Sequence, residues 1–371
     1  MPLILGLETS CDETAAAVVR DGREVLSNVV ATQHDLHLRY AGVVPEIASR
    51  AHLQRLLPVV TEAIQGAGIT LNQLDAVAVG NRPGLVGSLI VGVAAAKALA
   101  WSLDKPLLGV DHVRAHLHAA QLVDASTLDS NLESPPPAGA EPVAYPAIGL
   151  VVSGGHTTLY RMDAADRIQR LGATIDDAVG EAYDKAGVIL DAGYPGGPEV
   201  DRLAQRGDPR GPGVPQLPVS LLGRDSLDFS FSGLKTALLY AVRGQPEGRG
   251  KAATFRRNAI DLSDGQLADL AAAFQHAAVE AVIRKLGRAR RHLEQLDATP
   301  GSLILGGGVS ANSHLRARVQ KFAKQHGMRL HLPAMAYCVD NAAMIAGYGA
   351  VLLQRGEVAA LDLPVVATTR T

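Results

Sequence analysis

The amino-acid sequence predicts an α/β protein in which one arrangement of strands and turns occurs twice. Residues 3–19 and residues 148–160 share a pattern in which an apolar strand runs into a small polar turn and a second apolar strand follows. A third apolar strand leads into a run of glycines at 306–308 and then into a helix near Ser313. The chain has 371 residues, which is long enough for two cores. We therefore expect two similar domains with a cleft between them.

The turn Ser153-Gly154-Gly155 is the first candidate binding element. Glycines lack a Cβ, so their main-chain N–H groups can converge on one phosphate or carboxylate. Taken alone, such a turn is more often an ordinary glycine hairpin. The similar N-terminal hairpin and the turn at 306–308, which precedes a helix N-terminus that favours anions, strengthen the nucleotide-binding interpretation. This layout is that of actin-like ATPases and sugar kinases.

The composition is that of a folded globular protein, with 47% apolar and 19% charged residues. The net charge of −2 neither favours nor excludes nucleic acid, and 4% aromatic residues make extensive stacking of bases on aromatic side chains an unlikely mode of binding. Only two cysteines occur, so a disulfide framework is excluded and a reducing compartment is expected. No basic segment precedes the first apolar run, so we expect a cytoplasmic protein without a signal peptide.

Several elements of the first half follow from periodicity. A helix is expected over 48–67, a strand over 75–79, and a strand over 107–110 that ends at the helix cap Asp111. The apolar face expected for the 48–67 helix comprises Leu53, Leu56, Leu57, Val60 and Ile64. The run 85–103 is apolar enough to raise the question of a membrane span. Its lysine, glycines and alanines favour a close-packed buried helix instead.

The second half begins after a proline-rich stretch, 124–146, which we interpret as a surface insertion. We expect an acidic helix over 176–185, a turn over 193–198, a loop-rich span up to Gly223 and a helix over 234–242. The longest helix should begin at Ser263 or Asp264. Its basic far end, 284–291, is typical of a solvated face and is also a possible phosphate contact. A last helix is expected over 341–354, followed by a short, featureless tail.

His112 and His116 lie one helical turn apart, which is a chelating spacing. A coincidental pair is the alternative. A zincin protease is excluded because Val113 occupies the place of its catalytic glutamate. Asp340, at the start of the last helix, is either the helix cap or a third ligand. In a duplicated fold the last helix returns to the first domain, which would bring Asp340 near the histidines.

Together these motifs resemble one known family. The sequence motifs that carry the resemblance are, in chain order, Gly6-Leu7-Glu8-Thr9-Ser10-Cys11-Asp12-Glu13-Thr14, His112 with His116, Ser153-Gly154-Gly155-His156-Thr157, Phe229-Ser230-Phe231-Ser232-Gly233-Leu234-Lys235, Gly307-Gly308-Val309-Ser310-Ala311-Asn312 and Asp340-Asn341. They occur in the order found in the TsaD family, formerly called Gcp, the catalytic subunit of tRNA N6-adenosine threonylcarbamoyltransferase. The resemblance extends over nearly the whole chain, to about Gly356.

The resemblance implies an actin-like (ASKHA) fold of two duplicated RNase H-like domains. It also implies transfer of the threonylcarbamoyl group from threonylcarbamoyl-AMP to N6 of adenosine 37, in tRNAs that read codons beginning with A, with release of AMP. By the same resemblance, one divalent metal per subunit, iron(II) or alternatively zinc, is held by His112, His116 and Asp340. The implied substrate contacts are Val151, Val152, Ser153, Gly154, Gly155, Asp184, Gly197, Asp201 and Asn312. Asp12 and Glu13 are the candidates for proton handling.

The implied organisation has a metal-bearing domain I over 1–123 and 336–356, an insertion over 124–146, a nucleotide-binding domain II over 147–335 and a tail over 357–371. The implied partners are tRNA, a paralogous TsaB-type subunit that pairs through the first domain, and a TsaE-type P-loop ATPase, with no membrane. Arg82 and Val339 replace the glycine and threonine usual in the family, which puts substrate fit in question. The alternatives are a carbamoyltransferase of the same fold that acts on another acceptor, and a non-catalytic partner subunit.

Overall fold

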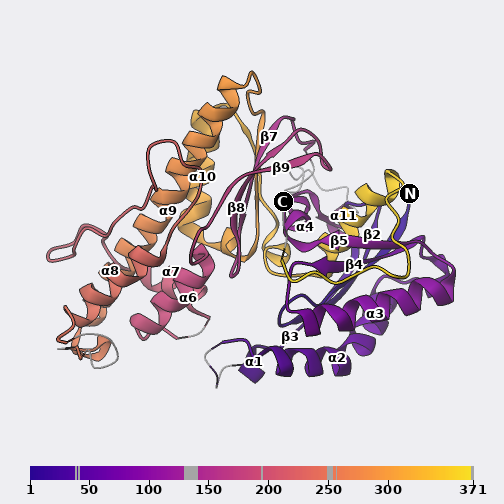
Figure 1. Ribbon diagram of the computed structural model, residues 1–371, viewed down its shortest axis with the longest axis horizontal. Helices are drawn as coiled ribbons and strands as arrows, with labels where there is room; N and C mark the ends of the chain where they lie inside the picture. The colour runs from indigo at the N-terminus through magenta and orange to yellow at the C-terminus, as the bar shows by residue number, and fades with distance from the viewer. Residues whose placement is uncertain are drawn as a thin grey trace.

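The computed structural model describes residues 1–37, 40, 42–128, 141–193, 195–248, 254–255 and 257–368. It confirms the predicted α/β architecture, with two sheets that form two lobes (Figure 1). The expected proline-rich centre of the 124–146 insertion falls on residues 129–140, outside the described residues.

The first sheet has six strands in the order β5-β4-β1-β2-β3-β6. They are β1 (Leu3–Glu8), β2 (Glu13–Arg20), β3 (Glu24–Thr32), β4 (Ala76–Arg82), β5 (Leu107–Asp111) and β6 (Val123–Asp124). The first three pair antiparallel, whereas β4 runs parallel to β1 and β5 runs parallel to β4.

The second sheet repeats this arrangement in the order β11-β10-β7-β8-β9. Its strands are β7 (Ala147–Val152), β8 (Thr157–Met162), β9 (Ile168–Ala173), β10 (Ser302–Gly306) and β11 (Arg329–His331). Here too the first three pair antiparallel and the last two add in parallel. The hairpins β1–β2 and β7–β8 therefore occupy equivalent places, and the predicted duplication is confirmed.

Helices cover both faces of the first sheet. α2 (Pro45–Gly66) and α3 (Val86–Leu103) pack on one face, and α11 (Ala342–Gln354) packs on the other. α4 (His112–His118) contacts β5 of the first sheet and both β7 and β10 of the second, so it lies where the lobes meet. The return of α11 to the first sheet supports the proposed division into domain I and domain II.

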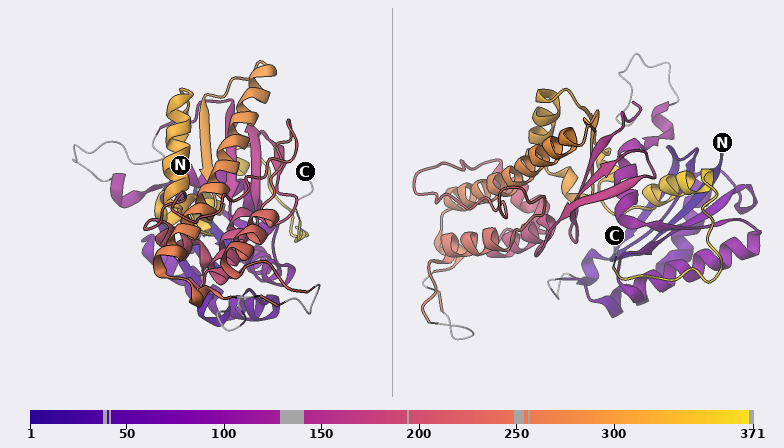
Figure 2. Two further views of the ribbon diagram at one scale, coloured as in Figure 1. Left: turned by 90° about the vertical axis from the view of Figure 1, so that its left-hand side faces the viewer. Right: turned by 45° about the horizontal axis from the view of Figure 1, so that its top comes forward.

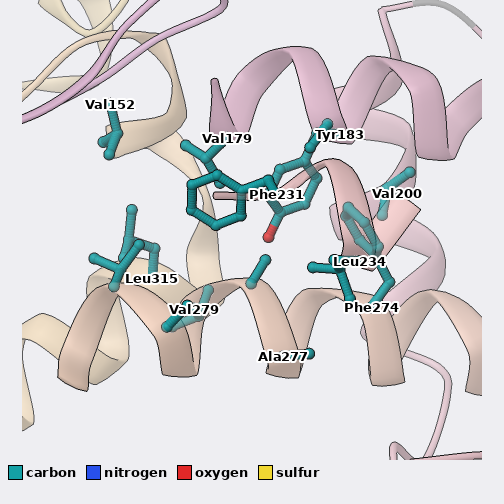
Figure 3. Close-up of a cluster of buried hydrophobic side chains, with 14 of the residues drawn as sticks. Val152, Val179, Tyr183, Val200, Phe231, Leu234, Phe274, Ala277, Val279 and Leu315 are labelled. Atoms are coloured by element: carbon teal, nitrogen blue, oxygen red, sulfur yellow. The ribbon is translucent and has the colours of Figure 1, made fainter. Parts of the chain in front are cut away.

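The second lobe contains α6 (Val179–Ile189), α7 (Gly196–Ala204), α8 (Ser232–Arg243), α9 (Asp264–Gln295) and α10 (Ser313–Gln325). Shorter helices are α1 (His34–His37), α5 (Ala125–Leu128) and the 3₁₀ turns Leu71–Gln73, Ala119–Gln121, Ala259–Asp261, Gly308–Ala311 and Met335–Tyr337. Aromatic rings from α6, α9 and the loop before α8 fill the core between them (Figure 3). Tyr183 meets Phe274 edge to face, with ring centroids 5.3 Å apart. The lobe is thus a layer of helices held on one face of its sheet (Figure 2).

Two expectations for the first lobe are wrong in part. Leu53 and Leu57 on α2 are 68% and 69% exposed, whereas Leu56, Val60 and Ile64 are buried as expected.

α3 is the one helix among the described residues that is long and apolar enough to cross a membrane, but its small residues pack on β4 and α2. Its opposite face is open, so α3 is half-buried rather than fully buried. Periodicity shows how apolar a face is but not whether a second layer covers it.

Two expectations for the second lobe also need correction. α6 begins at Val179, because Asp176 and Asp177 accept hydrogen bonds from the α8 region instead of continuing the helix. α7 occupies part of the span expected to be turn and loop. It begins with Gly196, Gly197 and Pro198, which favour turns inside a sequence but are tolerated in a first helical turn. The start of α9, with Ser263 as its cap, is confirmed.

Replacing Gly6 tests the close packing of α11 on β1. A Cβ at Gly6 would lie 2.3 Å from the Ala342 carbonyl oxygen and 2.7 Å from the Ala346 nitrogen. We expect Gly6→Ala to lower the free energy of unfolding by about 1–3 kcal/mol, because backbone must shift. Urea unfolding of this variant beside Gly233→Ala, whose Cβ would meet nothing within 4 Å, measures the difference. Equal midpoints for the two variants would contradict this packing.

Candidate active site and metal centre

A cleft of about 770 Å³ takes residues from both lobes. Its walls come from residues 10–13, 83–85 and 153–156, together with His112, Glu181, Asp184, Lys185, Val188, Gly308, Val339, Asp340 and others. Three sets of predicted site residues therefore meet there: the first turn, the nucleotide turn and the metal cluster. The carboxyl ends of β1, β4, β7 and β10 lead into these segments, which is where open α/β sheets place ligands.

His112, His116 and Asp340 come together, with ligand atoms all within 4.8 Å of one another. Asp340 Oδ1 lies 3.1 Å from His116 Nε2 and 3.5 Å from His112 Nε2. Asp111 caps α4 by accepting from the amides of Val113 and Arg114, which fixes the histidine helix. The alternative that Asp340 is a helix cap is wrong, because Asn341 caps α11. Asp340 is therefore available to the histidines.

The surroundings of the cluster fit a divalent metal. His116 is fully buried; among the described residues its Nδ1 has no hydrogen-bond partner, and its Nε2 faces Asp340 Oδ1 at 3.1 Å. The Nδ1 of His112 lies 2.9 Å from Glu8 Oε2, which leaves Nε2 directed toward Asp340. A carboxylate behind a ligating imidazole is the usual support of a protein metal site. Two imidazoles and one carboxylate suit iron(II) or zinc.

Burial and neighbouring charges shift the pKa values of the three residues in the cluster. Burial lowers the pKa of His116, whereas for His112 the Asp340 and Glu8 carboxylates outweigh burial and raise the pKa. Burial would raise the pKa of Asp340, but the two histidines lower it well below its ordinary value. The lowered pKa of Asp340 favours the ionised carboxylate, which is the form that binds a metal.

The turn between β1 and β2 brings Asp12 and Glu13 into the cleft beside Asp340. Burial, and then the nearby Asp340 and Asp12, raises the pKa of Glu13. The backbone of the turn is held by His52, whose Nε2 lies 3.1 Å from the carbonyl oxygen of Cys11. Sequence reasoning missed both His52 and Glu8. Glu8 could have been found as a charged residue in a strand that is otherwise apolar, but nothing local indicates His52.

The nucleotide turn is open where the nest was predicted. Gly154 and Gly155 are exposed, and a Cβ on either would meet nothing within 4 Å. Ser153 closes the turn, since its amide donates to the His156 carbonyl oxygen at 2.7 Å. The side chains of Val151 and Val152 are fully buried in the core, so only their backbone could contact a ligand.

The remaining predicted contacts lie around the starts of α7 and α10. Asp184 lines the cleft and accepts from the Gly196 amide at 2.9 Å, and Gly197 lies beside it. Asp201 accepts from the amide and hydroxyl of Ser313. Asn312 caps α10 and donates to Gln275 at 2.8 Å. Asp201 and Asn312 thus have structural partners and are not among the residues that line the cleft.

The two departures from the family pattern fall in different places. Arg82 does not line the cleft, because its Nε lies 3.5 Å from Asp111 Oδ2, beside the cap of α4. Val339, 51% exposed, does line the cleft next to Asp340.

The basic end of α9 is largely occupied by protein partners. Arg288 donates to the carbonyl oxygens of Leu221, Gly223 and Ser226. Arg284 and Arg290 pair with Glu280 and Glu294, each one turn away. These arginines stabilise the 221–226 loop and the helix, so the phosphate contact considered for 284–291 has little support.

Fold and site together define a protein of the actin-like class in which a histidine–aspartate cluster that could hold a metal ion lies at the interlobe cleft. The model of the TsaD family, described as tRNA N6-adenosine threonylcarbamoyltransferase, matches residues 24–347. Proteins of that name from Symbiobacterium thermophilum and Anaeromyxobacter dehalogenans are 47% and 48% identical to this chain, covering 98% of it and 95% and 98% of the relatives. The chain belongs to the TsaD family.

A solved structure supports the fold independently. HypF from T. kodakarensis superposes with a TM-score of 0.56 at 16% sequence identity, over 95% of this chain and 48% of HypF. At that identity the likeness is one of fold alone.

Glu8→Gln tests the support of the metal site. The neutral amide keeps the shape of the side chain, but it fixes the orientation of the His112 imidazole less firmly. It also makes this ring a weaker base. We expect the affinity for iron(II) or zinc to fall about 10–100-fold, measured by competition with a chelator. Glu46→Gln on the exposed start of α2 is the matched control. Equal affinities for the two variants would show that Glu8 does not support the site.

Proposed function

We propose that this chain transfers the threonylcarbamoyl group of threonylcarbamoyl-AMP to N6 of adenosine 37 in tRNAs that read codons beginning with A. Membership of the TsaD family supports the reaction type. The observation that carries the proposal is that the cleft combines an open glycine turn, two carboxylic acids and the histidine–aspartate cluster. An acyl-adenylate has a phosphate and a carbonyl that need such partners.

The proposed metal ligands are His112, His116 and Asp340, with iron(II) as the preferred ion and zinc as the alternative. When bound, a divalent ion supplies positive charge that polarises a carbonyl oxygen or neutralises a phosphate. The approach of Asp340 to both histidines and the Glu8–His112 pair support this assignment. The choice of iron follows from the family resemblance rather than from the donor set, which suits both ions.

The proposed adenylate site begins at the nucleotide turn. The Gly154 and Gly155 amides bind the phosphate, with Ser153 and the backbone of 151–152 holding the turn in shape. Asp184 and Asp201 accept hydrogen bonds from ribose hydroxyls or from adenine, and Gly197 and Asn312 contact the same part of the ligand. The exposed glycines and the placement of Asp184 in the cleft support this arrangement.

The proposed reaction forms one bond and breaks one. The N6 amine attacks the carbamoyl carbon, the bond from that carbon to the phosphate oxygen breaks, and AMP leaves with the electron pair. One proton must leave N6 during the transfer. We assign proton handling to Asp12 and Glu13, because both carboxyls line the cleft next to Asp340.

The proposed partners are tRNA, a TsaB-type subunit and a TsaE-type ATPase, in the cytoplasm. The outer faces of α2 and α3 support a protein partner, because Leu53, Leu57, Ile90 and Trp101 are exposed there by 68%, 69%, 51% and 74%. Adjacent helices with several large exposed apolar side chains are typical of an interaction surface. We assign this face to the TsaB-type subunit.

Nucleoside mass spectrometry tests the reaction. Unmodified tRNA is incubated with the chain, its two partner proteins and threonylcarbamoyl-AMP. We expect threonylcarbamoyl-adenosine with the parent chain and none with the His112→Ala, His116→Ala double variant, because the cluster is lost. Release of AMP without modified tRNA would instead favour a carbamoyltransferase acting on another acceptor. Product from the double variant would exclude the proposed role of the cluster.

The partner surface is tested by Leu53→Asp with Leu57→Asp. Charges in an apolar interface are not solvated, so we expect association with the TsaB-type subunit to weaken at least about tenfold, measured by analytical ultracentrifugation. Ile260→Asp, at an 85% exposed position before α9, is the control. If both proteins bind equally well, the partner binds elsewhere.

A further inference from the structure

Residues 358–367, here called the strap, follow α11 and cross the first lobe, where Figure 1 draws them as a yellow trace. The amide of Ala359 donates to the Leu107 carbonyl oxygen at 2.8 Å and forms an antiparallel bridge with β5. β5 is the edge strand of its sheet, whose outer backbone groups would otherwise be unpaired. The expectation of a featureless tail is therefore wrong for these residues.

The strap packs directly on the strand backbone. A Cβ at Gly109 would lie 2.7 Å from Leu363 Cδ1, so the leucine side chain occupies the space that a larger residue in β5 would fill. Asn81, 2% exposed, donates its side-chain amide to the Pro364 carbonyl oxygen at 3.0 Å. Its own backbone carbonyl accepts from the Val366 amide at 3.0 Å. The strap is thus fixed at successive points along β5 and β4.

The far end of the strap reaches the substrate cleft. The Gly84 amide donates to the Ala367 carbonyl oxygen at 3.3 Å, and Ala367 lines the cleft together with loop 83–85. On its other side this loop meets the first turn, since the Leu85 amide donates to the Ser10 carbonyl oxygen at 2.8 Å. A Cβ at Gly84 would lie 2.6 Å from the same oxygen. Loop 83–85 is clamped between the strap and the turn that carries the carboxylic acids.

We propose that the strap is a substrate-positioning element, which fixes loop 83–85 and thereby one wall of the cleft beside Asp12 and Glu13. The match to the family model ends at residue 347, before the strap begins. The inference rests on the proposed function, because the molecule positioned is the acyl-adenylate. A cleft wall that is already ordered binds its ligand more tightly, because none of the binding free energy is spent on ordering that wall. Without the strap, loop 83–85 loses the hydrogen bond between Gly84 and Ala367 and is ordered less firmly.

The test compares Leu363→Ala, and a chain ending after Glu357, with the control Leu361→Ala, whose side chain is 50% exposed. We expect KM for threonylcarbamoyl-AMP to rise about tenfold in the first two, with kcat and bound metal per chain unchanged, because loop 83–85 must then be ordered when the substrate binds. The control should match the parent. An unchanged KM, or a loss of bound metal in step with the rise in KM, would overturn the proposal. If the shortened chain does not fold, Leu363→Ala decides alone.

Failure of the proposed function would give a different experimental result from failure of the strap proposal. In that case the parent chain transfers nothing to tRNA, whatever the state of the strap. Binding of AMP by calorimetry then tests the strap independently of transfer. Affinity about tenfold weaker in Leu363→Ala than in Leu361→Ala supports the positioning role, and equal affinity, including no binding to either, overturns it.

Discussion

The site depends on a single short helix that lies between two sheets. α4 contacts β5 on one side and β7 and β10 on the other, and α11 packs against it. Because both of its histidines are buried at this junction, Asp340 can approach them only when α11 has returned to the first sheet. The cluster therefore forms only when both lobes are folded and correctly joined. A metal bound there would stabilise the same arrangement, since binding to the native state alone favours that state.

The site also requires that segments of backbone approach one another closely, which explains why glycine occupies particular positions. A Cβ at Gly306 would lie 2.2 Å from the His116 carbonyl oxygen, and one at Gly307 would lie 2.4 Å from that of Val152. Gly307 also has φ of 90°, a backbone conformation that other residues rarely adopt. The glycine run after β10 thus serves to bring the histidine helix and the nucleotide turn together. Gly308, the next residue, lines the cleft.

Four carboxylic acids gather along the cleft wall and directly behind it. Glu8, Asp12, Glu13 and Asp340 lie near one another, an arrangement that burial makes costly without a positive partner. His156 supplies no such charge, because burial, with His112 and His116, lowers its pKa to about 4. A positive partner for these carboxylates is thus favoured by the fold, which agrees with the proposed divalent metal and with the proposed transfer from a mixed carbamoyl–phosphate anhydride.

Local patterns in the sequence determined the two hairpins, the histidine pair, the glycine turns, the cap of α4 and the start of α9, because each depends on neighbours within a few residues. The resemblance to the TsaD family rested on these same motifs. Tertiary structure alone decided that Leu53 and Leu57 face outward, that Arg288 holds a loop, that Glu8 supports His112 and that the strap reaches the cleft. Those features depend on contacts between segments far apart in the chain, and periodicity within one segment carries no information about which distant segment will cover it.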